Sequence, residues 1–361
     1  MEAMGVDPTF WRAKRVLVTG HTGFKGAWLS LWLQQLGAEV TGFALEPPTQ
    51  PSLFEVARVA TGMRSVRADV RDDEHVMREF AEARPEIVIH MAAQSLVRPS
   101  YTDPVATYST NVMGTVHVLN AARSVGTVRA VLNVTSDKCY ENREWVWGYR
   151  EDEAMGGADP YSSSKACSEL VTSAYRSSFF RNSGIGLATA RAGNVIGGGD
   201  WAEDRVVPDF MRAAARREAL AIRNPEAVRP WQLVLEPIRG YLMLVQALWG
   251  DPTRYAGAWN FGPVAEDERP VKWLADRLVG RWGEGARWTN DVREHPREAH
   301  ILKLDCSKAR AHLDWHPVTT LEDALDTVVY WFRAYHANAD MRDTTEYQIA
   351  EFSRRSSVRK R

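Results

Sequence analysis

Two short stretches of the sequence combine residue types that could carry out acid–base chemistry. The triplet Ser136–Lys138 follows the apolar run Val131–Val134, so a hydroxyl, an acid and a base stand at the end of an expected buried strand. Tyr161 and Lys165 are four residues apart, which places them on one face of a helix. An ammonium beside a phenol favours the phenolate, which can accept the proton of an alcohol being oxidised. The two stretches therefore predict one active site.

The members of the triplet suggest different tasks. Asp137 suits the delivery of a proton to a leaving hydroxyl if a closed site raises its pKa. Lys138 could assist proton removal from a carbon beside a ketone, or stabilise the enolate charge. Ser136 adds a hydroxyl. The alternatives remain a capping turn with a surface ion pair for the triplet, and an exposed helix pair for Tyr161 and Lys165, because that spacing is common by chance.

A glycine turn precedes these stretches. Gly20, Gly23 and Gly26 follow the short β-branched run Arg15–Thr19 and open an amphipathic helix. This context is the one that a dinucleotide-binding turn requires, with small residues near a pyrophosphate and free N–H groups at the helix N-terminus. The spacing is GxxGxxG, and the alternative is a plain tight turn before a helix.

The second expected strand, Glu39–Ala44, bears on the choice of cofactor. It ends without the aspartate that usually binds the adenosine ribose, and Glu46 comes slightly late. We also expect no arginine there for a 2′-phosphate, which favours NAD over NADP. Asp69 and Val70 could hold the adenine edge, although Asp69 could equally be a turn or helix-capping acid.

Strands alternating with helices predict an α/β fold, a Rossmann-type doubly wound parallel sheet with a smaller C-terminal substrate-binding lobe. The expected NAD-binding domain covers residues 8–194, the lobe covers mainly 195–340, and 341–361 form a tail with a frayed basic ending. Within the lobe, 221–237 and 257–263 are expected to be loop-and-strand pieces. The expected strands are 15–19, 39–44, 64–68, 86–90, 128–134 and 186–190, and the expected helices include 72–83, 105–125, 161–180, 272–281, 306–312 and 320–335.

Composition excludes several classes of function. The 361 residues carry a net charge of −1 with a pI near 6.8, so there is no bulk attraction to nucleic acid or to an anionic membrane. Three scattered cysteines show no metal-ligand spacing, which predicts no metal site and a reduced, cytoplasmic setting. No apolar run is long enough to span a bilayer, and the first residues contain no apolar signal-peptide region.

Taken together, these motifs resemble the extended short-chain dehydrogenase/reductase superfamily and, within it, the CDP-glucose 4,6-dehydratase branch of nucleotide-sugar dehydratases. The resemblance covers about residues 8–337. The blocks that carry it are VTGHTGFKG (18–26), PPTQPSLF (47–54), TSDKCYEN (135–142), RAGNVIGGGDW (191–201) and IRNPEAVRPWQLVLEP (222–237).

The resemblance implies tightly held NAD that is recycled within each turnover. Tyr161 would take part in the oxidation of C4, water would leave across C5 and C6, and hydride would return to C6, giving a CDP-4-keto-6-deoxyglucose. Relatives that use dTDP-sugars have Thr-Asp-Glu at the triplet, where this chain has Ser-Asp-Lys. The lysine supports the CDP branch and leaves the C5 base open.

The resemblance also implies binding residues and a homodimer formed through the helices 105–125 and 161–180. The implied cofactor-binding residues are Gly20, Thr22, Gly23, Phe24, Lys25, Gly26, Asp69, Val70, Ala92, Ala93, Gln94, Asn111, Tyr161 and Lys165. The implied substrate-binding residues are Gln94, Asn194, Arg205, Arg229 and Asn260.

Two rival functions remain open at this point. A nucleotide-sugar 4-epimerase or decarboxylase would share the tyrosine, the lysine and NAD; Asp137 speaks against the epimerase, whereas Lys138 and Arg205 could imitate the decarboxylase's cationic pocket. A non-catalytic NAD-bound sensor would tend to lose Tyr161 or Lys165, and both are present.

Overall fold

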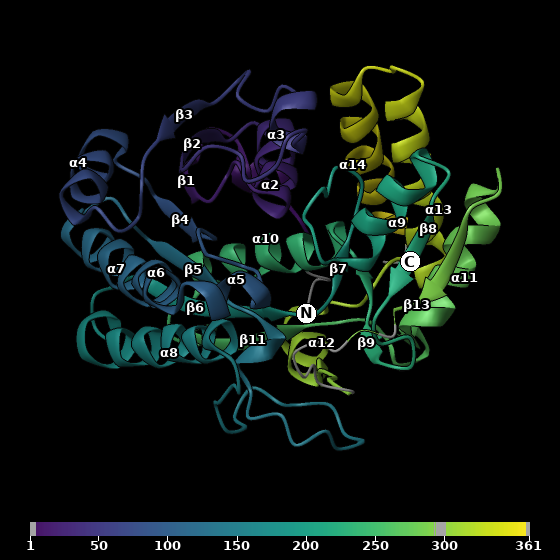
Figure 1. Ribbon diagram of the computed structural model, residues 1–361. Helices are drawn as coiled ribbons and strands as arrows, with labels where there is room; N and C mark the ends of the chain where they lie inside the picture. Colours follow the sequence, from purple (N-terminus) through teal and green to yellow (C-terminus); the bar gives the residue numbers. More distant parts are fainter. Residues whose placement is uncertain (1–4, 292, 294–300, 359–361) are drawn as a thin grey trace.

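The computed structural model describes residues 5–291, 293 and 301–358. Its centre is a seven-stranded parallel sheet with the strand order β11-β6-β5-β4-β1-β2-β3 (Figure 1). The strand order reverses between β1 and β4, and such a switch point opens a crevice at the carboxyl ends of the strands. The predicted doubly wound sheet is confirmed. Its strands are β1 (Arg15–Thr19), β2 (Glu39–Ala44), β3 (Arg64–Arg67), β4 (Ile87–His90), β5 (Ala130–Val134), β6 (Gly186–Ala192) and β11 (Gly257–Phe261).

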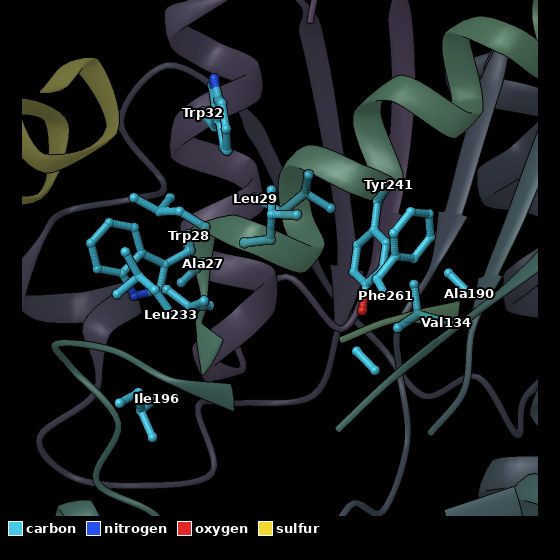
Figure 2. Close-up of a cluster of buried hydrophobic side chains, with 14 of the residues drawn as sticks. Ala27, Trp28, Leu29, Trp32, Val134, Ala190, Ile196, Leu233, Tyr241 and Phe261 are labelled. Atoms are coloured by element: carbon cyan, nitrogen blue, oxygen red, sulfur yellow. The ribbon is translucent and has the colours of Figure 1, made fainter. Parts of the chain in front are cut away.

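Helices cover both faces of this sheet. Alternate residues of a strand point to opposite faces, so Val16 and Val18 of β1 enter the core under α2 and α10, whereas Leu17 enters the core under α4 and α7. Figure 2 shows part of the first core, with Trp28 of α2 and Tyr241 of α10 among its buried side chains. The helices that matter for the site are α2 (Phe24–Gln35), α4 (Asp73–Ala83), α7 (Gly114–Ser124), α8 (Pro160–Tyr175) and α10 (Leu235–Gly250).

Two elements differ from the prediction for the C-terminal half. The segment 257–263 contains β11, which pairs with β6 and completes the main sheet rather than belonging to the smaller lobe. Helix α10 was not predicted. Every residue from Leu235 to Val245 is buried, because the helix lies between the sheet and the surrounding elements, and a helix buried all round has no amphipathic period to reveal it.

The smaller lobe consists of short strand pairs and helices near the carboxyl edge of the sheet. Its parts join segments that are distant in sequence, so no single run of residues forms it alone. They are β7 (Val195–Ile196) with β10 (Gln232–Leu233), β8 (Ala219–Ile222) with β13 (Arg287–Asn290), β9 (Val228–Pro230) with β12 (Glu268–Pro270), and the helices α9 (Val206–Ala215), α11 (Val271–Trp282), α12 (Ser307–Leu313) and α13 (Leu321–His336).

The C-terminal segment is a helix rather than the predicted tail. Residues Met341–Val358 form α14, which lies against α2 and α13. Met341, Thr345, Ile349 and Phe352 are buried, and their spacing of three to four residues places them on one helix face. The short basic ending, residues 354–361, had suggested a frayed tail. Residues 359–361 lie outside the described residues.

The predicted long helix over residues 105–125 is continuous but not uniform. It consists of α6 (Pro104–Tyr108), the π-helical turn η1 (Ser109–Met113) and α7. Such π turns occur often at functional sites, and this one contains Asn111. Among the described residues, no helix is long and apolar enough to cross a membrane.

Candidate active site

The glycine turn forms one wall of a large cavity, about 2390 Å³ in volume, at the carboxyl edge of the sheet. Gly20 has a φ of +77°, a conformation that favours glycine. A Cβ on Gly26 would lie 2.1 Å from the Gly20 carbonyl oxygen, and one on Gly20 would lie 2.7 Å from the Ala92 nitrogen. Both positions therefore require glycine, and the turn brings the N-terminus of α2 to the cavity.

Most of the predicted cofactor residues line this same cavity. They are Gly20, Thr22, Gly23, Phe24, Lys25, Gly26, Asp69, Val70, Ala92, Ala93, Gln94, Tyr161 and Lys165. Three separate strand ends supply them, after β1, β3 and β4, in addition to helix α8. This is the set that a dinucleotide crossing a switch point would contact.

Asn111 is placed differently from the other predicted cofactor residues. It is buried, with 2% exposure, and it does not line the cavity. Its Oδ1 accepts from the backbone N–H of Gln94 at 2.8 Å, and its Nδ2 donates to the Gln94 carbonyl at 2.9 Å and to Ser164 Oγ at 2.8 Å. Asn111 therefore fixes the loop after β4 to helix α8.

The end of β2 also differs from expectation, because an arginine does lie there. Arg67 ends β3 beside Ala44, and its Nε lies 3.0 Å from Glu46 Oε2. Arg67 is distant from Ala44 in sequence, but the parallel pairing of β2 with β3 brings it to the end of β2. Burial alone would raise the pKa of Asp69, but hydrogen bonds and the charge of Arg71 lower it, so this carboxylate is ionised.

The triplet after β5 turns away from the strand into the cavity. Ser136 caps the short helix η2 (Asp137–Cys139) by accepting from the Lys138 N–H at 3.2 Å. Asp137 is 3% exposed, and its Oδ1 accepts from the Ser136 hydroxyl at 3.1 Å. Its Oδ2 is buried and has no hydrogen-bond partner among the described residues. Burial raises the pKa of Asp137 against the opposing charges of Lys138, Arg229 and Lys25.

Tyr161 and Lys165 enter the cavity from the first turns of α8. The helix starts at Asp159, whose side chain accepts from the Ser162 N–H at 2.9 Å, followed by Pro160 at the first helical position, a common combination at helix starts. Tyr161 and Lys165 are 7% and 6% exposed. One helix face therefore presents both groups to the triplet.

The protonation of this pair differs from the prediction. Lys165 was expected to lower the pKa of Tyr161, but burial raises the pKa of Tyr161 to about 12, with Ser136 and Arg205 acting in the lowering direction. Burial also lowers the pKa of Lys165 to about 8. Burial shifts both groups toward their neutral forms because a low-dielectric site penalises charge of either sign, but with a pKa of about 8 Lys165 still carries its proton at neutral pH.

Lys25, which the resemblance gives only as a cofactor-binding residue, also lies within electrostatic reach of Asp137, Lys165 and Arg205. Its Nζ is 3.4 Å from the Tyr241 hydroxyl, and burial together with the charges of Arg205 and Lys165 lowers its pKa to about 8, against the opposing effect of Asp137. We call Lys25, Asp137, Tyr161, Lys165 and Arg205 the catalytic cluster. Sequence spacing gave no signal for Lys25, because α2 delivers it from across the cavity.

Four of the five predicted substrate residues line the cavity, namely Gln94, Asn194, Arg205 and Arg229. Arg205 pairs with Asp200 at 3.0 Å. Asn260 was placed incorrectly. It is fully buried in β11, where its Nδ2 donates to the carbonyls of Tyr149 and Asp305 and its Oδ1 accepts from the Tyr140 hydroxyl at 2.8 Å.

Within the part of the chain that the structure describes, no group of three or more His, Cys, Asp or Glu side chains is arranged to hold a metal ion. The chemical groups that converge in the cavity are instead a phenol, amines, a carboxyl with a raised pKa and arginines beside a glycine turn. This set suits proton transfer at an alcohol and at a leaving hydroxyl, next to a bound dinucleotide.

Comparison with known proteins gives a consistent answer. Residues 17–328 match the family model described as GDP-mannose 4,6 dehydratase. The chain is 53% identical to the CDP-glucose 4,6-dehydratase of Salmonella typhimurium, covering 96% of this chain and 98% of that protein. It is 25% identical to dTDP-glucose 4,6-dehydratase 1 of Escherichia coli, covering 88% and 92%.

Solved structures share the same fold. The dTDP-glucose 4,6-dehydratase DesIV of Streptomyces venezuelae, solved with NAD and TYD bound, superposes with a TM-score of 0.74 at 25% identity, covering 90% of this chain and 98% of that one. An epimerase of Methanothermobacter thermautotrophicus gives a TM-score of 0.77 at 24% identity, covering 91% and 95%. The chain therefore belongs to the NAD-using family of nucleotide-sugar 4,6-dehydratases and, within it, to the CDP-glucose 4,6-dehydratases.

Proposed function

We propose that this protein dehydrates CDP-glucose to CDP-4-keto-6-deoxyglucose, with NAD as a recycled cofactor, through the residues of the catalytic cluster. The observation that carries the residue assignment is Asp137. A buried carboxyl with a raised pKa and an unpartnered oxygen is what a general acid requires. It lies in the same cavity as Tyr161, so alcohol oxidation and water loss can share one bound sugar.

The cavity fits NAD by its shape and by its donors. Gly20 and Gly26 leave no room for side chains where the turn is closest-packed, and the N-terminus of α2 offers backbone N–H groups to a pyrophosphate. The residues proposed to hold the cofactor are Gly20, Thr22, Gly23, Phe24, Lys25, Gly26, Asp69, Val70, Ala92, Ala93, Gln94, Tyr161 and Lys165, with Asn111 acting through Gln94. Bound NAD supplies a temporary acceptor for the hydride of the internal redox cycle.

Tyr161 removes the proton of the C4 hydroxyl while that carbon is oxidised. With a pKa of about 12, its phenol needs cationic neighbours to act as a base, and Arg205 and Lys165 are two of the cations that line the same cavity. Ser136 hydrogen-bonds the phenol and holds it in place. The pair thus converts an alcohol into a ketone, which acidifies the proton on C5.

Asp137 and Lys138 then carry out the loss of water. The protonated Asp137 gives its proton to the C6 oxygen as the C6–O bond breaks with its electron pair on oxygen. Lys138 lines the cavity next to Asp137, where it either takes the C5 proton or stabilises the enolate. Bound NAD would supply the hydride that C6 gains, and the proton that C5 regains would come from the group that removed it.

Arg205, Arg229, Asn194 and Gln94 are proposed to hold the substrate. Arg229 is only 9% exposed and lines the cavity on β9, and a guanidinium suits a diphosphate through paired charge-assisted hydrogen bonds. Asn260 is omitted, because its amide is used within the core.

We also propose a homodimer, formed through α6, η1 and α8. Large apolar side chains are exposed on these helices, including Val105 at 77%, Met113 at 46% and Leu170 at 59%. Such an apolar face is typical of a helix-pair interface between identical subunits. Sedimentation of the purified protein should give twice the monomer mass, and Leu170→Glu should reduce that mass to a single chain.

Product masses test the proposed reaction. The NAD-loaded protein is incubated separately with CDP-glucose, dTDP-glucose, UDP-glucose and GDP-mannose, and each product is weighed by mass spectrometry. Loss of one water from CDP-glucose supports the proposal. An unchanged mass with an altered sugar configuration would indicate an epimerase, and loss of water from another nucleotide sugar alone would move the base preference.

A further inference from the structure

Gly193, which directly follows β6, lies where the turn after β5 meets the smaller lobe. A Cβ at this position would lie 2.7 Å from Pro230 Cγ and 3.1 Å from Asp137 Oδ2. Pro230 is the last residue of β9 and directly follows Arg229. The lack of a side chain at residue 193 therefore lets β9 approach the one carboxyl oxygen of Asp137 that has no hydrogen-bond partner among the described residues.

This approach places Arg229 where its charge can act both on Asp137 and on a bound diphosphate. Its guanidinium lines the cavity, with Nη1 donating to the Val228 carbonyl at 2.9 Å, and its charge acts on the Asp137 carboxyl. Arg229 is the arginine of β9 and is the residue proposed to bind the substrate diphosphate. The other cations that act on Asp137, Lys25 and Lys138, come from α2 and η2, outside the lobe.

Asp137 is held in a balance of opposing effects. Burial favours its protonated form, whereas the Ser136 hydroxyl and three cations favour the carboxylate. The charge of Asp137 also acts to raise the pKa of the phenols of Tyr161 on α8 and Tyr241 on α10. Because large effects oppose one another, the loss of a single cation changes the proton affinity of this carboxyl.

We propose that the diphosphate of the substrate, by binding Arg229, withdraws that positive charge from Asp137 and so causes Asp137 to take up the proton that it later delivers to the C6 oxygen. This inference rests on the proposed function, because it requires a nucleoside diphosphate on β9. It assigns Arg229 a positioning role in acid catalysis beyond its contribution to affinity.

The proton balance follows directly. Substrate binding transfers one proton from solvent to Asp137, and that proton leaves with the C6 oxygen as water. The proton lost from C5 is matched by reprotonation at C5, and the C4 hydroxyl proton that Tyr161 accepts returns one proton to solvent over the turnover. Nucleotide binding in the lobe thus shifts Asp137 further toward the protonated form that burial already favours.

Infrared difference spectroscopy of the NAD-loaded protein tests this inference, with CDP as the probe. The carboxylic acid band of Asp137 is assigned by its loss in Asp137→Asn, and its pH titration is recorded with and without saturating CDP. We expect CDP to raise the pKa of Asp137 by about one unit or more, the usual effect of removing an arginine's charge from a carboxyl. Arg229→Lys should keep this response.

A second variant removes the dependence on CDP affinity. In Arg229→Gln, the pKa of Asp137 should already be raised in the protein without CDP. Arg223→Gln is the matched control, because Arg223 lines the same cavity but pairs with Asp204 at 2.7 Å; it should titrate like the unmodified protein.

Equal Asp137 titrations with and without saturating CDP, or no change in Arg229→Gln, would overturn the inference. Failure of this coupling can be distinguished from failure of the proposed reaction. A protein that dehydrates CDP-glucose without a CDP-dependent shift at Asp137 keeps its function and loses this coupling. A protein that shows the shift but releases no water keeps the coupling and loses the function.

Discussion

Helix α8 carries two buried charged groups one turn apart, Lys165 and Glu169, and their surroundings are opposite. Glu169 is paired with Arg191 through Nε to Oε1 at 2.9 Å and Nη2 to Oε2 at 2.8 Å. The hydroxyls of Thr135 and Thr189 also donate to it. We call these four residues the α8 anchor. Burial alone would raise the pKa of Glu169, but Arg191 and the two hydroxyls lower it.

In the catalytic cluster Arg205 is paired with Asp200, but Asp137 and Lys165 lack a complete set of partners. Among the described residues, Asp137 Oδ2 has no hydrogen-bond partner, and the amine of Lys165 donates to one acceptor, the Val134 carbonyl, at 3.4 Å. Thr135 donates to Glu169 in the α8 anchor, whereas the next two residues, Ser136 and Asp137, line the cavity. Full pairing keeps a charge fixed and stabilises the fold, whereas incomplete pairing leaves a proton free to move.

Tyr161→Phe should have the largest effect on activity. Removing the phenolic hydroxyl deletes the group proposed to accept the C4 proton, so turnover should fall by at least about 10²–10⁴-fold, while NAD remains bound. Steady-state product formation and a cofactor-binding titration check this pair of outcomes. Near-normal turnover would remove Tyr161 from the mechanism.

Glu169→Gln should have the largest effect on stability. It leaves the buried Arg191 charge without its counterion, which typically costs about 3–5 kcal/mol of unfolding free energy. Because the folded-state pKa of Glu169 is lowered, its contribution is present at neutral pH and disappears as the pH falls below about 4.5. Denaturant unfolding at several pH values measures it.

The matched control for that variant is an exposed ion pair. Glu82→Gln removes the partner that Arg64 contacts at 2.9 Å on the surface, and it should cost no more than about 1 kcal/mol. Equal losses for the two variants would contradict the role of the α8 anchor.

Asn260→Ala should affect stability but not substrate binding. It removes one hydrogen-bond partner each from the carbonyls of Tyr149 and Asp305 and from the Tyr140 hydroxyl, at a cost of about 1–3 kcal/mol. The KM of the folded protein should stay unchanged, whereas Asn194→Ala should raise it. An increased KM in Asn260→Ala would return this residue to the substrate site.

The smallest expected effect concerns the alkaline limit of activity. Turnover should decline as the pH rises through about 8, where the Lys165 ammonium loses its proton. Glu169 favours that ammonium, so Glu169→Gln should shift the decline to lower pH, measured on the folded fraction. The same alkaline decline of turnover in both proteins would show that the catalytic cluster and the α8 anchor do not interact electrostatically.

Much of this organisation could be predicted from sequence, for identifiable physical reasons. The glycine turn, the triplet and the Tyr161–Lys165 pair depend on local spacing, and strand–helix alternation fixes which strand ends meet. Lys25 was predicted to bind the cofactor but not to lie near Tyr241 and Asp137, and Arg67 and Gly193 were not assigned, because each reaches its place through strand pairing or helix packing. Helix α10 was missed because complete burial removes periodicity, and Asn260 because residue type does not distinguish a ligand contact from a core hydrogen bond.

Asp137→Asn tests the central claim most directly, because asparagine imitates the protonated carboxyl in shape but cannot give up a proton. We expect the rate of water loss from CDP-glucose, followed by product mass, to fall by about 10²–10⁴-fold. The same variant should be more stable than the unmodified protein at neutral pH, because burial disfavours the charge it removes. Unchanged water loss would contradict the assignment of Asp137 as the acid and, with it, the proposed division between the catalytic cluster and the α8 anchor.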